Sequence, residues 1–89
     1  MFTVEWRDEA LNDLAGAWIA ADGPSRQAIT AAVRRIDDAL EQNPLDTGEE
    51  REGNHRIHFD ASLVVIFQVF EAERRVWVVM ARPISRRRS

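Results

Sequence analysis

The feature that most constrains the fold of this sequence is the segment LVVIFQVF, residues 63–70, which is apolar on both sides of a β-strand. Only Gln68 interrupts the apolar run. The preceding segment, 54–59, alternates instead, with Arg56 and His58 on its polar side, which is typical of a half-buried strand. A strand that is apolar on both sides needs cover on both faces of its sheet. One side of 63–70 must therefore enter the core, and something else must cover the other side.

The composition indicates one globular domain, residues 1–89, since 89 residues leave no room for a second core. Apolar residues make up 45% of the chain and charged residues 30%. The absence of cysteine excludes disulfides and thiolate metal sites, and His55 and His58 with nearby acids form no recognisable metal-ligand set. No cofactor motif, apolar leader or membrane-spanning stretch is present in the sequence. We therefore expect a cytoplasmic protein without metal, cofactor or membrane contact.

Charge is distributed unevenly along the chain. Residues 1–73 contain six Arg and all fifteen acids, a net charge of −9, whereas residues 74–89 contain six Arg and no acid, a net charge of +6. The basic C-terminal tail, about 83–89, could bind a nucleic acid backbone or an acidic protein. Its candidate contact residues are Arg86, Arg87 and Arg88. A solvated tail without a partner is an equally good interpretation.

The spacing of apolar residues predicts the order β-α-α-β-β-β. A short strand over 2–6 precedes a helix capped by Asp8, and a second helix has Pro24 in its first turn and ends at Asn43. An acidic loop over 44–53 comes next. Three strands follow the loop, at about 54–59, 63–70 and 75–82. We expect an α+β fold with a mainly antiparallel four-stranded sheet and two helices packed on one face.

Two packed helices are about as wide as four strands, so they cover one sheet face and leave the other open. If 60–62 is a three-residue turn, the helix-covered face holds Ile57, Phe59, Leu63, Val65, Phe67, Val69, Val76, Val78 and Met80. The open face then holds Arg56, His58, Val64, Ile66, Gln68, Phe70, Trp77, Val79 and Ala81. A slip of one residue would exchange the faces. We expect a partner chain to cover this apolar surface, rather than loop 44–53 or the tail, with Trp77 as an anchor. Trp6 and Trp18 are expected in the core.

The chain resembles the RelE/ParE family of bacterial toxin–antitoxin toxins. The similar segments cover nearly all of it: VEWRDEALNDLAGAW, RRIDDALEQNPLDTGEEREGNHRIHF and SLVVIFQVFEAERRVWVVMARPISRR. Ala10 to Leu14 matches the Ala-x-x-Asp-Leu helix core of the family, Val65 to Val69 matches its ViY-x-V-like strand, and Arg82 matches the arginine that ends its last strand. The joint order of these motifs makes the resemblance specific.

The resemblance implies a toxin of a type II toxin–antitoxin system, encoded beside an antitoxin that wraps it with an extended or helical segment. The antitoxin would then cover the open face and contact Val64, Ile66, Gln68, Phe70, Trp77 and Val79. RelE-like members cut messenger RNA in the ribosomal A site, and ParE-like members inhibit DNA gyrase without cutting RNA. Contact of the complex with DNA would come through the antitoxin.

The RNA-cleaving branch needs basic groups that deprotonate the 2′-hydroxyl, balance the phosphorane charge and protonate the leaving oxygen. The resemblance assigns these roles to His58, as acid or base, with Arg56 and Arg82. Arg56 could instead pair with the acidic loop, and His58 could be a solvated strand residue. Val64 stands where RelE-like members have an arginine, and the chain lacks the C-terminal tyrosine that many of them use. Net acidity also disfavours RNA binding. We therefore favour a ParE-like toxin, with an endonuclease or a non-toxic interaction module as alternatives.

Overall fold

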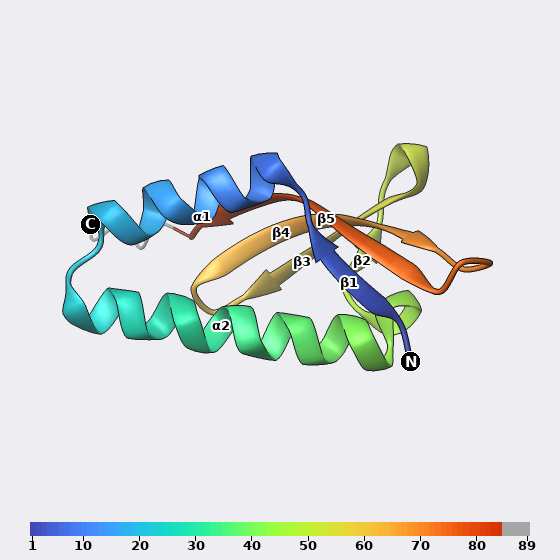
Figure 1. The fold of residues 1–89 in the computed structure, drawn as a ribbon, viewed down its shortest axis with the longest axis horizontal. Helices are drawn as coiled ribbons and strands as arrows, with labels where there is room; N and C mark the ends of the chain where they lie inside the picture. The colour runs from blue at the N-terminus through green and yellow to red at the C-terminus, as the bar shows by residue number, and fades with distance from the viewer. Residues whose placement is uncertain (85–89) are drawn as a thin grey trace.

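The computed structural model describes residues 1–84, which form two α-helices and a five-stranded mixed sheet (Figure 1). In chain order the elements are β1 (Thr3–Trp6), α1 (Asp8–Ala20), α2 (Gly23–Gln42), β2 (Glu49–Glu50), β3 (His55–Asp60), β4 (Leu63–Phe70) and β5 (Arg75–Pro83). The strand order is β1-β5-β4-β3-β2, with β1 parallel to β5 and the other neighbours antiparallel. The predicted α+β class is confirmed. The fifth strand is β2, two residues of the predicted acidic loop that pair with β3.

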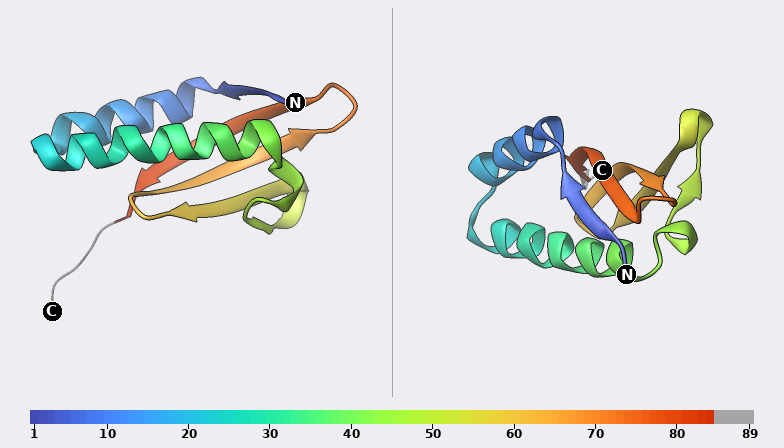
Figure 2. Two further views of the ribbon diagram at one scale, coloured as in Figure 1. Left: turned by 90° about the horizontal axis from the view of Figure 1, so that it is seen from below. Right: turned by 45° about the vertical axis from the view of Figure 1, so that its right-hand side comes forward.

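The two helices form a hairpin on one face of the sheet, so the molecule has two layers (Figure 2). The start of α2 is fixed by Asp22, whose side chain accepts a hydrogen bond of 2.9 Å from the backbone N–H of Ser25. Pro24 lies in the first turn, where its missing N–H is not needed. One stripe of α2 is buried against the sheet, namely Ile29, Ala32, Ile36 and Leu40. The amphipathic spacing in the sequence therefore determines which side of α2 enters the core.

The core lies between this stripe and alternate residues of the two central strands. Those strands contribute Leu63, Val65, Phe67, Val76, Val78 and Ala81, all fully buried. Trp6 packs against this core and donates a 2.7 Å hydrogen bond from its indole N–H to Asp37. The prediction that Trp18 lies in the core is wrong, because this residue of α1 is 42% exposed.

The turn between β3 and β4 is shorter than predicted, and this changes which residues of β3 face the core. Only residues 61 and 62 lie between the paired ends of the strands. Directly paired residues share a face, so Arg56 and His58 lie on the side of buried residues of β4, not on the open face. The open face instead receives Ile57 and Phe59. The predicted faces of β3 are therefore reversed, because a one-residue slip moves every side chain across the sheet.

A β-bulge in β5 makes a second change. β4 and β5 pair regularly on both sides of Val79, which has no paired residue of its own. Beyond this bulge the alternation reverses, so Met80 lies on the open face and Ala81 is buried, the opposite of the prediction. The remaining predicted open-face residues of these strands do lie away from the core: Val64, Ile66, Gln68, Phe70 and Trp77.

We expect Gly48→Ala to destabilise the fold by about 2 kcal/mol or more. Gly48 has a φ of +72°, and a Cβ there would clash with the backbone carbonyl of Ile57 in β3. The matched control is Gly16→Ala in α1, where a Cβ meets nothing within 4 Å. That change should raise stability by up to about 1 kcal/mol, because alanine favours a helix. Urea unfolding of both variants measures the difference, and equal effects would contradict the structure.

A second prediction concerns pH and the ion pair between α2 and the end of β3. Arg35 donates two hydrogen bonds to Asp60, of 3.0 and 2.6 Å, and this lowers the pKa of the Asp60 carboxyl below its usual 3.8. The pair therefore stabilises the fold above that value, and its contribution disappears as pH falls through the lower, folded pKa. Asp60→Asn should lower the melting temperature by a few degrees at pH 7, since Arg35 is exposed and screened.

The melting temperatures of Asp60→Asn and the unsubstituted chain should converge as the pH falls below 3.8 and through the lower, folded pKa of Asp60. Asp38→Asn is the control, because Asp38 is exposed on α2 and makes no ion pair within residues 1–84. A difference for Asp60→Asn that persists unchanged at low pH would show that the Arg35 pair is not its source.

Candidate functional site

The open face of the sheet forms a groove of about 710 Å³ between α1 and the connection that leads into β3. Its lining residues are Glu9, Asn12, Asp13, Arg51, His55, Ile66, Val79, Met80 and Arg82. The side chains from α1 make one wall, those from the β2–β3 connection make the other, and apolar residues of β4 and β5 make the floor. The groove is thus the unfilled space on the sheet face that the helix hairpin does not cover.

A second hollow, of about 570 Å³, continues the groove toward Trp77 and shares Glu9 and Val79 with it. The Trp77 ring is held on two sides. The guanidinium carbon of Arg7 lies 4.3 Å from its ring centroid, and the Phe70 ring packs edge-on with a centroid distance of 4.7 Å. These contacts fix the indole as a half-buried apolar platform at this end.

The opposite end of the groove is organised by Asp13 on α1. Its carboxylate accepts a 3.2 Å hydrogen bond from the backbone N–H of Ala81 and lies 3.7 Å from Nε of Arg82. β1 pairs with β5 only as far as Val78, so Ala81 lies on a part of β5 that β1 does not cover. Asp13 therefore closes an open strand edge and also holds an arginine in the groove.

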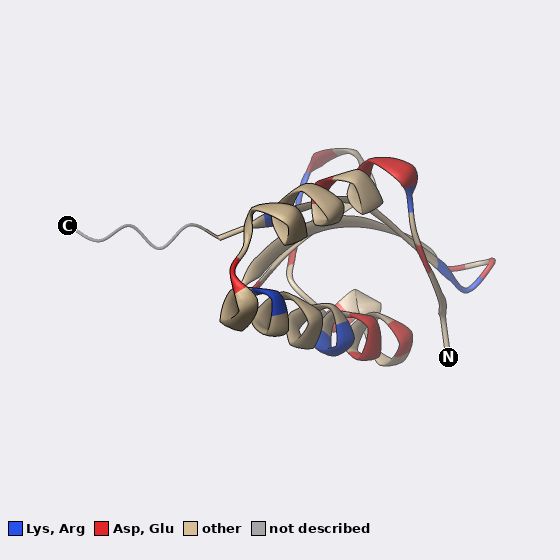
Figure 3. Cartoon of the chain, turned by 60° about the vertical axis from the view of Figure 1, so that its left-hand side comes forward, with Lys and Arg blue, Asp and Glu red and all other residues tan. Residues whose placement is uncertain are grey.

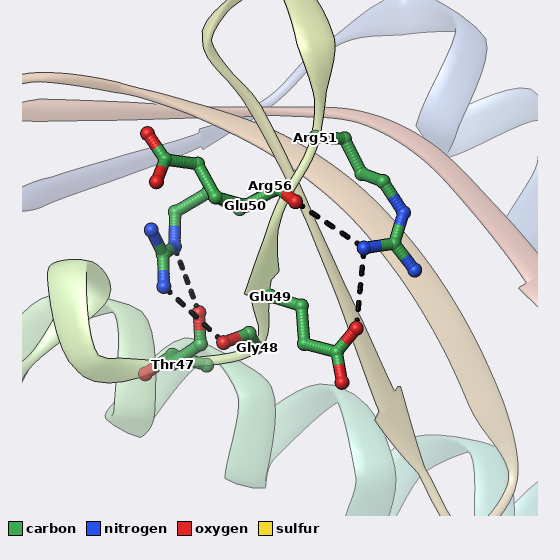
Figure 4. A network of polar contacts seen from close by, with 6 residues as sticks. All are labelled: Thr47, Gly48, Glu49, Glu50, Arg51 and Arg56. Atoms are coloured by element: carbon green, nitrogen blue, oxygen red, sulfur yellow. Dashed lines mark hydrogen bonds and ion pairs between the residues drawn. The ribbon is translucent and has the colours of Figure 1, made fainter.

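Of the three residues predicted as a catalytic cluster, only Arg82 lies in the groove. Arg56 lies on the other side of the sheet, where its guanidinium donates hydrogen bonds of 3.0 and 3.2 Å to the carbonyls of Thr47 and Gly48 (Figure 4). Within residues 1–84 Arg56 makes no ion pair, neither with an acid of the groove nor with an acid of the loop before β3. His58 shares that side of the sheet. The structure therefore separates Arg56 and His58 from Arg82, and Arg56 holds the loop before β2.

Two basic residues outside the predicted catalytic cluster line the groove instead: Arg51 and His55. Arg51 reaches to the other side of the strands from Arg56 (Figure 4) and contacts the Glu49 carboxylate at 3.1 Å. His55 pairs with Gln68, which places it on the open face. The length of the turn after β3 is the signal that would have found His55, because a two-residue turn places it on the same face as Gln68.

The residues predicted to bind an antitoxin all lie on the open face or, for Val79, in the bulge that lines the groove. The tail residues Arg86, Arg87 and Arg88 lie outside the described residues. Within residues 1–84, no cluster of three His, Asp or Glu side chains could hold a metal ion. No helix in that range is long and apolar enough to cross a membrane.

The sequence matches no family model and no curated protein. Solved structures, by contrast, are similar over almost the whole chain. A chain of the toxin–antitoxin complex RelBE2 from Mycobacterium tuberculosis has a TM-score of 0.76 and 17% identity, covering 96% of this chain and 93% of the other. A chain of the chromosomal ParDE system from P. aeruginosa has a TM-score of 0.73 and 16% identity, covering 96% and 98%.

The intact RelBE toxin–antitoxin complex of E. coli also contains a similar chain, with a TM-score of 0.63 and 15% identity, covering 97% of this chain and 100% of the other. The protein therefore has the fold of RelE- and ParE-type toxins. The fold implied by the resemblance in the sequence is confirmed, and both branches of the family are among its structural neighbours.

Proposed function

We propose that this protein is the toxin of a type II toxin–antitoxin system and that its antitoxin covers the open face of the sheet. The observation that carries the proposal is the groove, whose apolar floor has no cover from any residue in 1–84. A groove of this kind is a binding surface for another chain rather than a stable solvent boundary. Similar chains from solved toxin–antitoxin complexes support a protein partner.

We further propose a ParE-like mode of action, directed at DNA gyrase without cleavage of RNA. Three observations support it. Arg56 and His58 lie on the opposite side of the sheet from Arg82, so the three cannot act on one phosphodiester. Arg82 lies beside the carboxylate of Asp13, which offsets its charge. The chain also contains no tyrosine.

A RelE-like endonuclease acting on ribosome-bound messenger RNA is the second candidate. The observation that favours it is that Arg51, His55 and Arg82 all line one groove. In that arrangement His55 would exchange the proton and the two arginines would balance the phosphorane charge. The third candidate is a non-toxic interaction module, which would keep the antitoxin-binding face and inhibit no target.

The function is tested by tight induction of the full chain alone in a bacterial host, with growth, pulse-labelled protein synthesis and the DNA-damage response followed together. We expect growth arrest and a damage response while translation continues, because blocked gyrase leaves broken DNA. Early loss of translation would identify the endonuclease instead. Unaffected growth would contradict a toxin and leave the interaction module.

The two candidate toxins also differ in their response to histidine substitution. A gyrase-directed toxin should keep its growth inhibition in both His55→Gln and His58→Gln, because neither residue then performs chemistry. An endonuclease should lose about 10²–10⁴-fold in cleavage rate in His55→Gln only, as expected for loss of a general acid or base. His58→Gln is the matched control, since it lies on the other side of the sheet. Cleavage is measured by mapping the 5′ ends of cellular messenger RNA.

A further inference from the structure

We infer that the groove selects a basic amphipathic helix of the antitoxin, with its Lys or Arg side chains directed toward α1. The inference rests on the proposed function, because it specifies the partner of the same groove. It follows from three properties of the site: an apolar floor, an acidic wall on one side, and a strand edge that is already occupied.

The floor is matched to the apolar stripe of an amphipathic segment. Ile66, Val79 and Met80 form it at one end, and the fixed ring of Trp77 extends it at the other. A single helix presents apolar side chains at i, i+3, i+4 and i+7, which is the pattern by which helices bind in such grooves. The floor contributes affinity, and its two walls determine which charges the bound helix must have.

The wall on the α1 side is acidic. Asp8 and Glu9 lie in the first turn of α1, are exposed and make no ion pair within residues 1–84. Figure 3 shows acidic positions at the start of this helix. Glu5 and Asp13 extend the same side of the groove, and each has an arginine beside it. Two carboxylates therefore remain available for cations of a partner without displacing an existing pair.

The opposite wall differs in charge. It presents Arg51 and His55, with Glu49 beside Arg51 at 3.1 Å. A helix with basic side chains along both flanks would thus bring one flank against Arg51. A helix with basic residues on one flank can direct them toward the acids of α1, and neutral or acidic residues then suit the flank that faces Arg51 and His55. The asymmetry of the two walls therefore fixes the rotation of the helix about its axis.

A helix fits better than an added β-strand because the nearby edge of β5 is occupied. The N–H of Arg7 donates to the carbonyl of Val78 at 2.9 Å, and the N–H of Ala81 donates to Asp13 at 3.2 Å. An incoming strand would have to break these bonds to extend the sheet. The occupant consequently lies on the sheet face, in the groove, rather than beside its edge.

The test uses two synthetic 16-residue helical peptides with an identical leucine stripe, one flanked on a single side by Lys and the other by Glu. Calorimetric titration of the full chain at about 50 mM salt should show that the Lys peptide binds about tenfold more tightly. The difference should shrink strongly at about 500 mM salt, where exposed charges are screened. Ile66→Glu should abolish binding of the Lys peptide if it occupies the groove.

The charge requirement is tested with the double variant Asp8→Asn/Glu9→Gln. It should weaken binding of the Lys peptide about two- to fivefold per charge removed. The matched control, Asp38→Asn/Glu73→Gln, removes the same two residue types at exposed positions that do not line the groove, and it should leave the affinity unchanged. Equal weakening in both double variants would attribute the effect to net charge and overturn the inference.

Three other results would also overturn it. They are stronger binding of the Glu peptide, competition of a single-stranded RNA oligomer for the groove, and tighter peptide binding after Arg86, Arg87 and Arg88 are changed to Ser. The last result would mean that the tail of this chain occupies the acidic wall. Peptide binding does not depend on toxicity, so the growth experiment can fail independently of this one.

Discussion

The structure depends on how β4 is buried. Alternation along this strand places one set of apolar side chains between the sheet and α2, and the same alternation forces the other set onto the opposite face. A hairpin of two helices covers only one face of the sheet. The apolar surface on the open face is therefore a necessary consequence of the core. A chain of this size that buries Leu63, Val65 and Phe67 must present Val64 and Ile66 to a partner or to water.

The class of fold follows from local patterns, and local patterns predict it well. The stripes of the two helices and the apolar run of β4 are visible in the sequence, because each arises from the period of one element. The face of β3 is different, since it depends on the length of the turn after Asp60. Ala61 and Ser62 suit a turn of two or three residues equally, so the sequence does not specify the register. A difference of one residue in the length of this turn decides whether Arg56 or His55 lies on the face of the groove.

The end of β5 could not be predicted for a related reason. Val79, Met80 and Ala81 are all apolar, so the hydrophobic pattern has the same appearance with or without a bulge. The groove also draws Asp13 from α1 and Arg51 from the β2–β3 connection, which are far apart in the sequence. No local period relates them. Ile66 and Val79 of the floor were therefore predictable from strand alternation, whereas Met80 depends on the bulge and the charged walls on the arrangement of the whole chain.

The walls also bear on the choice between a cleaving and a non-cleaving toxin. Cleavage of a phosphodiester requires positive charge that is free to meet a developing anion. Arg82 is the one predicted catalytic arginine on the open face, and its Nε lies 3.7 Å from the carboxylate of Asp13. The same carboxylate accepts a hydrogen bond from the backbone N–H of Ala81 at the edge of β5. The bond from Ala81 keeps the Asp13 carboxylate in this place, so its negative charge stays beside Arg82 and offsets part of the positive charge there. An arginine with a carboxylate held beside it offers less positive charge to a transition state in RNA cleavage, which is why we propose gyrase rather than messenger RNA as the target.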